Sequence, residues 1–130
     1  MDFLADTVFL IDLWREARSP GRATRFAREH EGEQVGINWV VAGEFLAGAE
    51  AAGQDADGVR RFLERYPLVQ SSPSIIQRYA EIYADLKRSN QLIGPNDLWI
   101  AASCSAFDKP ILTRNVDEFQ RVKGLRVVGY

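Results

Sequence analysis

The sequence contains one cysteine, Cys104, and one histidine, His30, among its 130 residues. A single cysteine excludes an internal disulfide and a zinc site built on several cysteines. A single histidine excludes hydrolysis of RNA by a pair of histidines, which favours metal chemistry. No apolar run approaches the ~20 residues that cross a bilayer, and no basic segment precedes an apolar one at the start of the chain. We therefore expect a cytoplasmic protein.

The composition is that of a globular chain, with 46% hydrophobic and 26% charged residues. We expect one domain over residues 1–130, because this length suffices to bury one hydrophobic core. The net charge is −2, yet 13 of the 16 basic residues are arginine, whose planar guanidinium binds phosphate in a fixed geometry. A nucleic-acid-binding role would therefore depend on a local basic patch.

Short apolar segments alternate with helical segments along the chain. The expected strands are 3–5, 35–37, 68–69, 110–113 and 126–128, and the expected helices are 7–14, 20–30, 39–51, 55–66, 73–88 and 97–107. Ser19-Pro20 and Ser72-Pro73 each resemble a helix cap followed by proline, and Asn38 is placed to cap the helix after it. This alternation predicts an α/β fold in which a mostly parallel sheet is covered on both faces.

Four acids occupy comparable places in this pattern. Asp6 follows the first strand, Asp97 begins a buried helix, and Asp117 follows the strand that ends at Thr113. Each of these acids has a plain alternative role as a helix cap or as a solvated loop residue. Glu44 differs, because its spacing from apolar neighbours places it on the packed face of helix 39–51, where an unpaired carboxylate is costly.

The carboxyl ends of parallel strands meet at one edge of a sheet, which is where ligands bind in such folds. Carboxylates brought together there repel each other unless a hard cation is present. The four acids therefore suggest a magnesium or manganese site.

Four motifs, taken in order, resemble the PIN domain of VapC-type toxins. They are Asp6-Thr7-x-x-Leu10-Ile11-Asp12, Glu44-x-x-x-Gly48, Asn96-Asp97-x-x-Ile100-Ala101-Ala102 and Leu112-Thr113-Arg114-Asn115-x-x-x-Phe119. The resemblance implies an α/β/α sandwich with a central, mostly parallel sheet of four to five strands. It also implies a Mg²⁺- or Mn²⁺-dependent ribonuclease that forms a homodimer and is neutralised by a cognate antitoxin.

Carried over to this sequence, the resemblance assigns metal binding to Asp6, Glu44 and Asp97. The fourth acid of the family has no exact counterpart, since Asn115 holds the nearest position and Asp117 follows two residues later. We expect Asp117 to be the fourth catalytic acid, with Asn115 as the alternative at that position. The remaining assignments are secondary: we expect Thr7, Thr113 and Asn115 to support the acids, and Arg114 to contact a phosphate of the RNA.

Other functions remain open at this point. A nuclease of the same fold could mature RNA or cut DNA without an antitoxin, and a module without catalytic activity could only bind. A receiver-like phosphoacceptor module also places acids at strand ends, but it requires adjacent acids after the first strand and a lysine after the last. Here Asp6 lies between Ala5 and Thr7, and no lysine follows Val128. A further expectation tests the whole scheme: the strand that ends at Asp6 should lie beside the strand that ends at Thr113.

Overall fold

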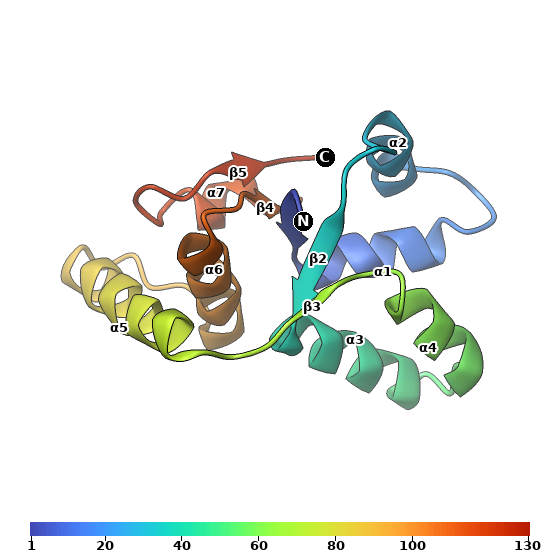
Figure 1. Cartoon of the computed structure of the whole chain (residues 1–130), viewed down its shortest axis with the longest axis horizontal. Helices are drawn as coiled ribbons and strands as arrows, with labels where there is room; N and C mark the ends of the chain where they lie inside the picture. The colour runs from blue at the N-terminus through green and yellow to red at the C-terminus, as the bar shows by residue number, and fades with distance from the viewer.

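The computed structural model describes residues 1–130 and contains one sheet of five strands in the order β3-β2-β1-β4-β5 (Figure 1). All neighbouring strands are parallel. The strands are β1 (Phe3–Ala5), β2 (Val35–Asn38), β3 (Leu68–Val69), β4 (Ile111–Leu112) and β5 (Val127–Val128). Strand β1 is central and pairs with β4 through Ala5 and Leu112. The expected neighbourhood of Asp6 and Thr113 is thereby confirmed.

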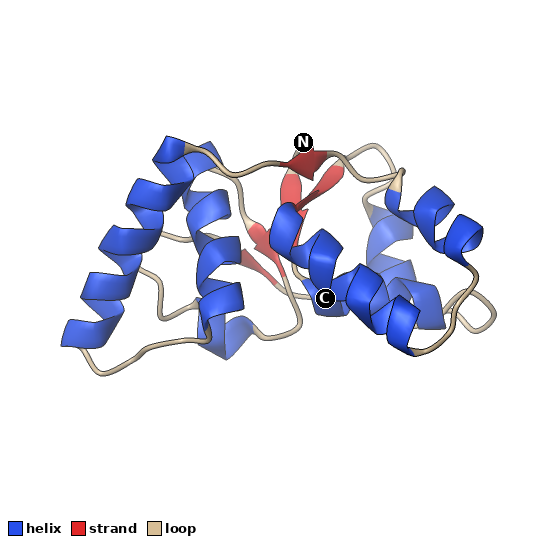
Figure 2. Cartoon of the chain, turned by 90° about the horizontal axis from the view of Figure 1, so that it is seen from below, coloured by secondary structure: helices blue, strands red, loops and turns tan.

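Seven helices surround the sheet. They are α1 (Thr7–Arg15), α2 (Arg22–Glu29), α3 (Trp39–Ala51), α4 (Ala56–Leu63), α5 (Pro73–Arg88), α6 (Pro95–Phe107) and α7 (Val116–Phe119). Helices α5 and α6 pack together on one side of the strands, while α1 to α4 lie on the other (Figures 1 and 2). The predicted α/β/α sandwich is confirmed. None of these helices combines the length and the apolar character that crossing a bilayer requires.

The core forms where the central strands meet α1 and α6. All three residues of β1 are buried, as are Phe9 and Leu10 of α1. Helix α6 is buried along most of its length, with Cys104 fully enclosed. The nearly continuous apolar and small residues of α6 thus correctly predicted a helix in the middle of the fold.

Side chains at the strand ends begin three of the helices as expected. The backbone N–H of Phe9 donates to Asp6 at 3.1 Å, that of Val41 donates to Asn38 at 3.0 Å, and Ser72 caps α5. The acid Asp6 is therefore a helix cap as well as a candidate site residue. Its cap role fixes the direction of its carboxylate.

Three predicted helix boundaries were wrong. Helix α2 begins at Arg22 rather than Pro20, because the Glu16 carboxylate accepts hydrogen bonds from the backbone N–H groups of Gly21 and Thr24, each at 2.8 Å. A cap supplied from the end of α1 replaces the one expected from Ser19. Helix α6 begins at Pro95 rather than residue 97, because proline suits the first helical position. Helix α4 ends at residue 63 rather than 66.

Candidate active site

The carboxylate of Asp6 lies buried at the end of β1. One oxygen caps α1, and the other accepts a hydrogen bond from the Thr113 hydroxyl at the end of β4. The hydroxyl oxygen of Thr113 in turn accepts the backbone N–H of Asn115 at 2.9 Å. Burial raises the pKa of Asp6 above its ordinary value, although these hydrogen bonds act in the opposite direction. Two adjacent strands thus hold one carboxylate in a single orientation.

Glu44 is exposed, so its expected burial on the packed face of α3 was wrong. Val41 and Phe45 face the core, whereas Leu46, also expected to face inward, is 47% exposed. The carboxylate of Glu44 nevertheless has two partners across the site. It accepts the Thr7 hydroxyl at 2.7 Å and the Asn96 side-chain amide at 3.3 Å. Glu44 therefore joins the first turns of α1 and α6.

Asp97 lies half-buried in the first turn of α6 and faces other acids. Its pKa is raised to about 7. Burial is the largest cause, followed by a hydrogen bond to Glu118 and that residue's negative charge, and then by the charges of Asp6 and Glu44. Asp97 thus lies within electrostatic reach of three other carboxylates.

The fourth acid at the site is Glu118, which acts on the pKa of Asp97, whereas Asp117 does not. Asp117 is exposed and makes no hydrogen bond or salt bridge, so the structure does not bring it to the other acids. Adjacent residues of α7 face different directions, and it is Glu118 that accepts the Asn115 side-chain amide. The Asn115-x-x-Glu118 spacing, a capping-box-like pattern, was the available signal for this residue.

Arg114 is a cation beside the acids at the end of β1. Its Nη1 donates to Asp12 Oδ2 at 3.2 Å, and its side chain is 54% exposed. Arg114 opposes the rise in the pKa of Asp6, which places its charge close to that carboxylate. Neither Asp12 nor its second partner, Tyr130, was expected from the sequence to belong to this region.

The donors at this edge have the chemistry of a magnesium or manganese site, since they are carboxylate oxygens supported by hydroxyl and amide groups. Burial, and after it the negative charges of Glu118, Asp6 and Glu44, raise the pKa of Asp97, so a cation bound there would stabilise its ionised form. As arranged, no three acidic, histidine or cysteine side chains surround one point closely enough to hold an ion. An ion would compete with Thr7, Asn96 and Thr113 for the carboxylate oxygens.

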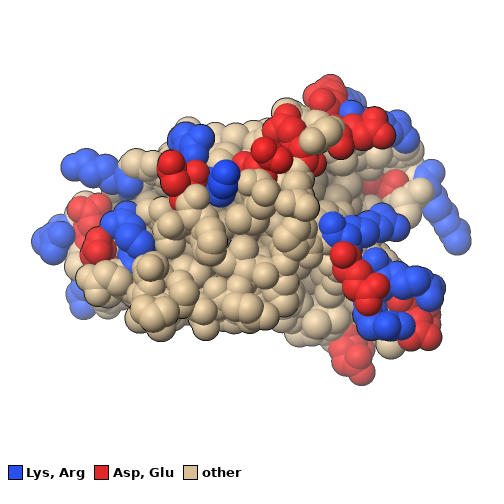
Figure 3. All heavy atoms as spheres, viewed as in Figure 1, with Lys and Arg blue, Asp and Glu red and all other residues tan.

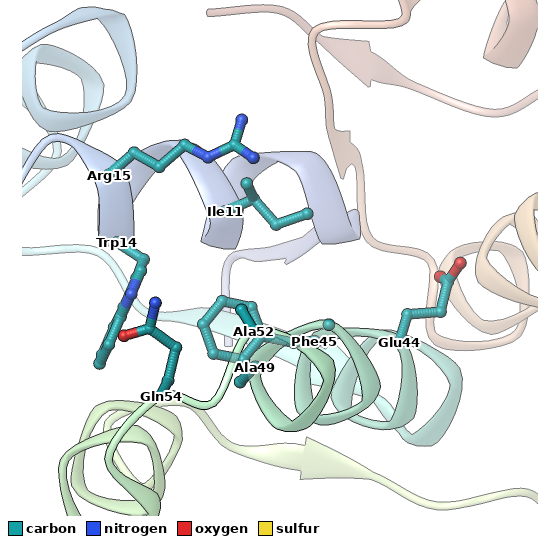
Figure 4. A pocket seen from close by; sticks show the side chains of 9 residues that line it. Ile11, Trp14, Arg15, Glu44, Phe45, Ala49, Ala52 and Gln54 are labelled. Atoms are coloured by element: carbon teal, nitrogen blue, oxygen red, sulfur yellow. The ribbon is translucent and has the colours of Figure 1, made fainter.

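A groove between α1 and α3 leads to this site. It is lined by Ile11, Trp14, Arg15, Glu44, Phe45, Gly48, Ala49, Ala52 and Gln54. Figure 4 shows Glu44 at one end of the groove and Trp14 with Gln54 at the other. An apolar surface therefore runs directly up to one of the site's acids.

Comparison with known proteins agrees with this geometry. Residues 3–125 match the family model of the PIN domain. The chain is 31% identical to Ribonuclease VapC1 of Methanocaldococcus jannaschii over 95% of this chain and 85% of that protein. It is 26% identical to Ribonuclease VapC1 of Haemophilus influenzae strain R2866, covering 97% of this chain and 96% of that protein.

Solved structures share the fold over nearly the whole chain. The VapBC-1 structure from nontypeable Haemophilus influenzae matches with a TM-score of 0.82 at 25% identity, over 99% of this chain and 98% of that one. A VapBC2 structure from Rickettsia felis, bound to a promoter DNA fragment, matches with a TM-score of 0.84 at 19% identity, over the same shares of both chains. The chain therefore belongs to the PIN domain family.

Proposed function

We propose that this protein is a divalent-metal-dependent endoribonuclease and the toxin of a toxin–antitoxin pair. The observation that carries the proposal is the position of Asp97, which lies among Asp6, Glu44 and Glu118 at the carboxyl edge of the sheet with its pKa raised to about 7. Relatives named Ribonuclease VapC1 align with nearly the whole chain and support the assignment.

In this proposal Asp6 and Asp97 hold a Mg²⁺ or Mn²⁺ ion, and Glu44 and Glu118 complete the acidic pocket. A bound ion of this kind lowers the pKa of its water and offsets the charge that develops on the phosphate oxygens. Glu118 takes the place that the sequence suggested for Asp117, because Glu118 faces Asp97.

The chain's own residues prepare the acids for this task. Thr113 and the backbone N–H of Phe9 fix the two oxygens of Asp6, while Thr7 and Asn96 fix those of Glu44. Asn115 holds Glu118 from the neighbouring turn. Arg114 then offers its guanidinium to a phosphate of the RNA, since Arg binds phosphate through several donors at once.

Cleavage of labelled single-stranded RNA and single-stranded DNA of the same sequence tests the proposal. We expect RNA cleavage with MgCl₂ or MnCl₂ and none with EDTA. Asp97→Asn should be inactive, whereas Asp117→Asn, a matched loss of one exposed acid, should keep wild-type activity. Cleavage of DNA but not RNA would instead support a DNA nuclease of the same fold.

An antitoxin is the proposed partner, and the groove beside Glu44 is its proposed docking place. Ile11, Trp14, Phe45 and Ala49 supply apolar contacts there, and Glu44 at its end suits an arginine or lysine of the partner (Figure 4). The candidate is a small protein encoded next to this one. Isothermal titration of that candidate into wild type and into Glu44→Gln should show weaker binding by the variant.

A homodimer is the proposed assembly. Large apolar side chains lie exposed on β3 and α5: Leu68 is 49%, Ile76 54% and Tyr83 38% exposed. Figure 3 shows a broad region without charged side chains on the face where Figure 1 places these two elements, with charges gathered toward its ends and upper edge. A second copy would remove this surface from water.

The organisation and location follow from the same proposal. The family match spans residues 3–125, which supports one domain over the whole chain. Because RNA is the proposed substrate, the cytoplasm is the proposed place of action.

A further inference from the structure

Asp12 joins three distant parts of the chain beside the acidic pocket. It lies on α1, and its Oδ2 accepts hydrogen bonds from the hydroxyl of Tyr130 at 2.8 Å and from Nη1 of Arg114 at 3.2 Å. The side chain of Asp12 is only 15% exposed, whereas that of Arg114 is 54% exposed. One shielded carboxylate oxygen therefore receives both a phenol and a guanidinium.

Tyr130 is itself held in place. Its ring packs edge-on against Phe9, with the ring centroids 5.1 Å apart, and Phe9 is 1% exposed. Phe9 also donates its backbone N–H to Asp6. The phenol is thus fixed beside the first turn of α1, which Asp6 caps, and it restricts the position of the Asp12 carboxylate.

Arg114 follows Thr113 directly, and these two neighbours contact two acids on or beside α1. Thr113 donates to Asp6, and Arg114 donates to Asp12. A guanidinium has five N–H donors. Hydrogen bonding to Asp12 occupies Nη1 and leaves the other donors free on an exposed side chain. Arg114 is therefore held at the rim of the acidic pocket with donors to spare.

We propose that Asp12 and Tyr130 are positioning residues that hold the Arg114 guanidinium at the rim of the acidic pocket, where it binds a phosphate of the substrate. This inference rests on the proposed ribonuclease function. A long arginine side chain loses rotamer freedom when it is fixed, so fixing it before the RNA arrives strengthens phosphate binding. If the contacts served only to attach Tyr130 to α1, the effect of removing its phenol on RNA binding would not depend on Arg114.

A double-mutant cycle separates the two roles. Cleavage of a labelled single-stranded RNA under single-turnover conditions in MgCl₂ gives the apparent Kd and the maximal rate for wild type, Tyr130→Phe, Arg114→Gln and the double variant. We expect Tyr130→Phe to raise the apparent Kd about threefold to tenfold, which is less than the full effect of losing a charge-assisted hydrogen bond because the contact between Asp12 and Arg114 remains. In the Arg114→Gln background the same change should have no further effect.

Two matched variants complete the experiment. Asp12→Asn should weaken RNA binding as Tyr130→Phe does. Tyr66→Phe should behave as wild type, because the phenol of Tyr66 makes no hydrogen bond. A Tyr130→Phe effect that persists in full without Arg114, or an apparent Kd unchanged by Tyr130→Phe, would overturn the proposal.

A second readout does not depend on RNA. The ¹⁵N relaxation of the Arg114 Nε–H group should report an ordered side chain in wild type and a mobile one in Tyr130→Phe. Equal mobility in both proteins would overturn the positioning role even if RNA is cleaved. Absence of RNA cleavage by the wild-type protein, together with an ordered Arg114 that Tyr130→Phe releases, would instead overturn the ribonuclease proposal and leave the positioning role supported.

Discussion

Replacing Asp97 with asparagine should make the metal-free protein more stable while removing its activity. The pKa of Asp97 rises from 3.8 to about 7 because of burial and neighbouring acids. At about 1.36 kcal/mol per pKa unit, that shift sets an upper bound of about 4 kcal/mol. Asp97 is half-exposed, so solvent screening reduces the expected gain to about 1–2 kcal/mol. The lost interaction with the helix dipole, about 0.5 kcal/mol, is smaller.

The pH dependence of this gain gives it a recognisable signature. Between pH 3.8 and about 7 the folded protein holds a proton at Asp97 that the unfolded chain releases. The contribution of Asp97 to the wild-type free energy of unfolding therefore falls as the pH rises through that window. Above about pH 7 this contribution stays constant. Asparagine has no such dependence. The advantage of Asp97→Asn should be absent near pH 4, grow toward pH 7 and then stay constant.

Urea unfolding in EDTA at a series of pH values measures this effect, with Asp117→Asn as the control. The control loses the same formal charge from an exposed position without partners, so its free energy of unfolding should stay within about 0.5 kcal/mol of wild type. An Asp97→Asn variant no more stable than wild type at pH 8, or more stable by an amount independent of pH, would contradict the raised pKa of Asp97.

Further substitutions test other parts of the account. Glu118→Gln should lower RNA cleavage at least tenfold in the labelled-RNA assay, because it removes the acid that faces Asp97; equal activity would return the fourth position to another residue. Binding of Mg²⁺, followed by calorimetry, should weaken as the pH falls below about 7, because a proton then competes at Asp97; affinity independent of pH would exclude Asp97 as a ligand. Ile76→Glu should convert a dimer into a monomer in light scattering, since it places charge on the exposed apolar surface of α5. Asn38→Ala should lower the free energy of unfolding by about 2–3 kcal/mol in urea, because Asn38 is buried, caps α3 and donates to Ser103; a loss below 0.5 kcal/mol would contradict that role.

The order of the elements was predictable from the sequence because local signals agreed with the fold. Three local signals each predict one structure: Ser72 before proline starts α5, Asn38 starts α3, and the continuous apolar sequence of α6 forms a buried helix. The start of α2 was not predictable in this way, since its cap comes from Glu16, several residues earlier in the chain. Local rules describe a helix end only when the residues that satisfy it are adjacent.

The residues of the candidate site also differ in how far local signals in the sequence located them. Asp6 and Asp97 were placed correctly because each follows directly from the end of a strand or the start of a helix. Glu44 was expected on a packed face, but helical spacing gave its direction only roughly, and its partners lie on other elements. The choice between Asp117 and Glu118 depended on the direction of one short helical turn, which composition does not reveal.

In the proposed mechanism, a pocket of acids at the end of β1 uses a divalent metal to cleave RNA. The most direct measurement is cleavage of a labelled single-stranded RNA by wild type and Asp6→Asn during titration with MgCl₂. Asparagine can still cap α1, so the variant should remain folded, as circular dichroism can verify. We predict that cleavage by wild type rises with Mg²⁺ from none in EDTA and that Asp6→Asn shows none at any concentration. Cleavage by wild type in EDTA, or undiminished cleavage by Asp6→Asn, would contradict this mechanism.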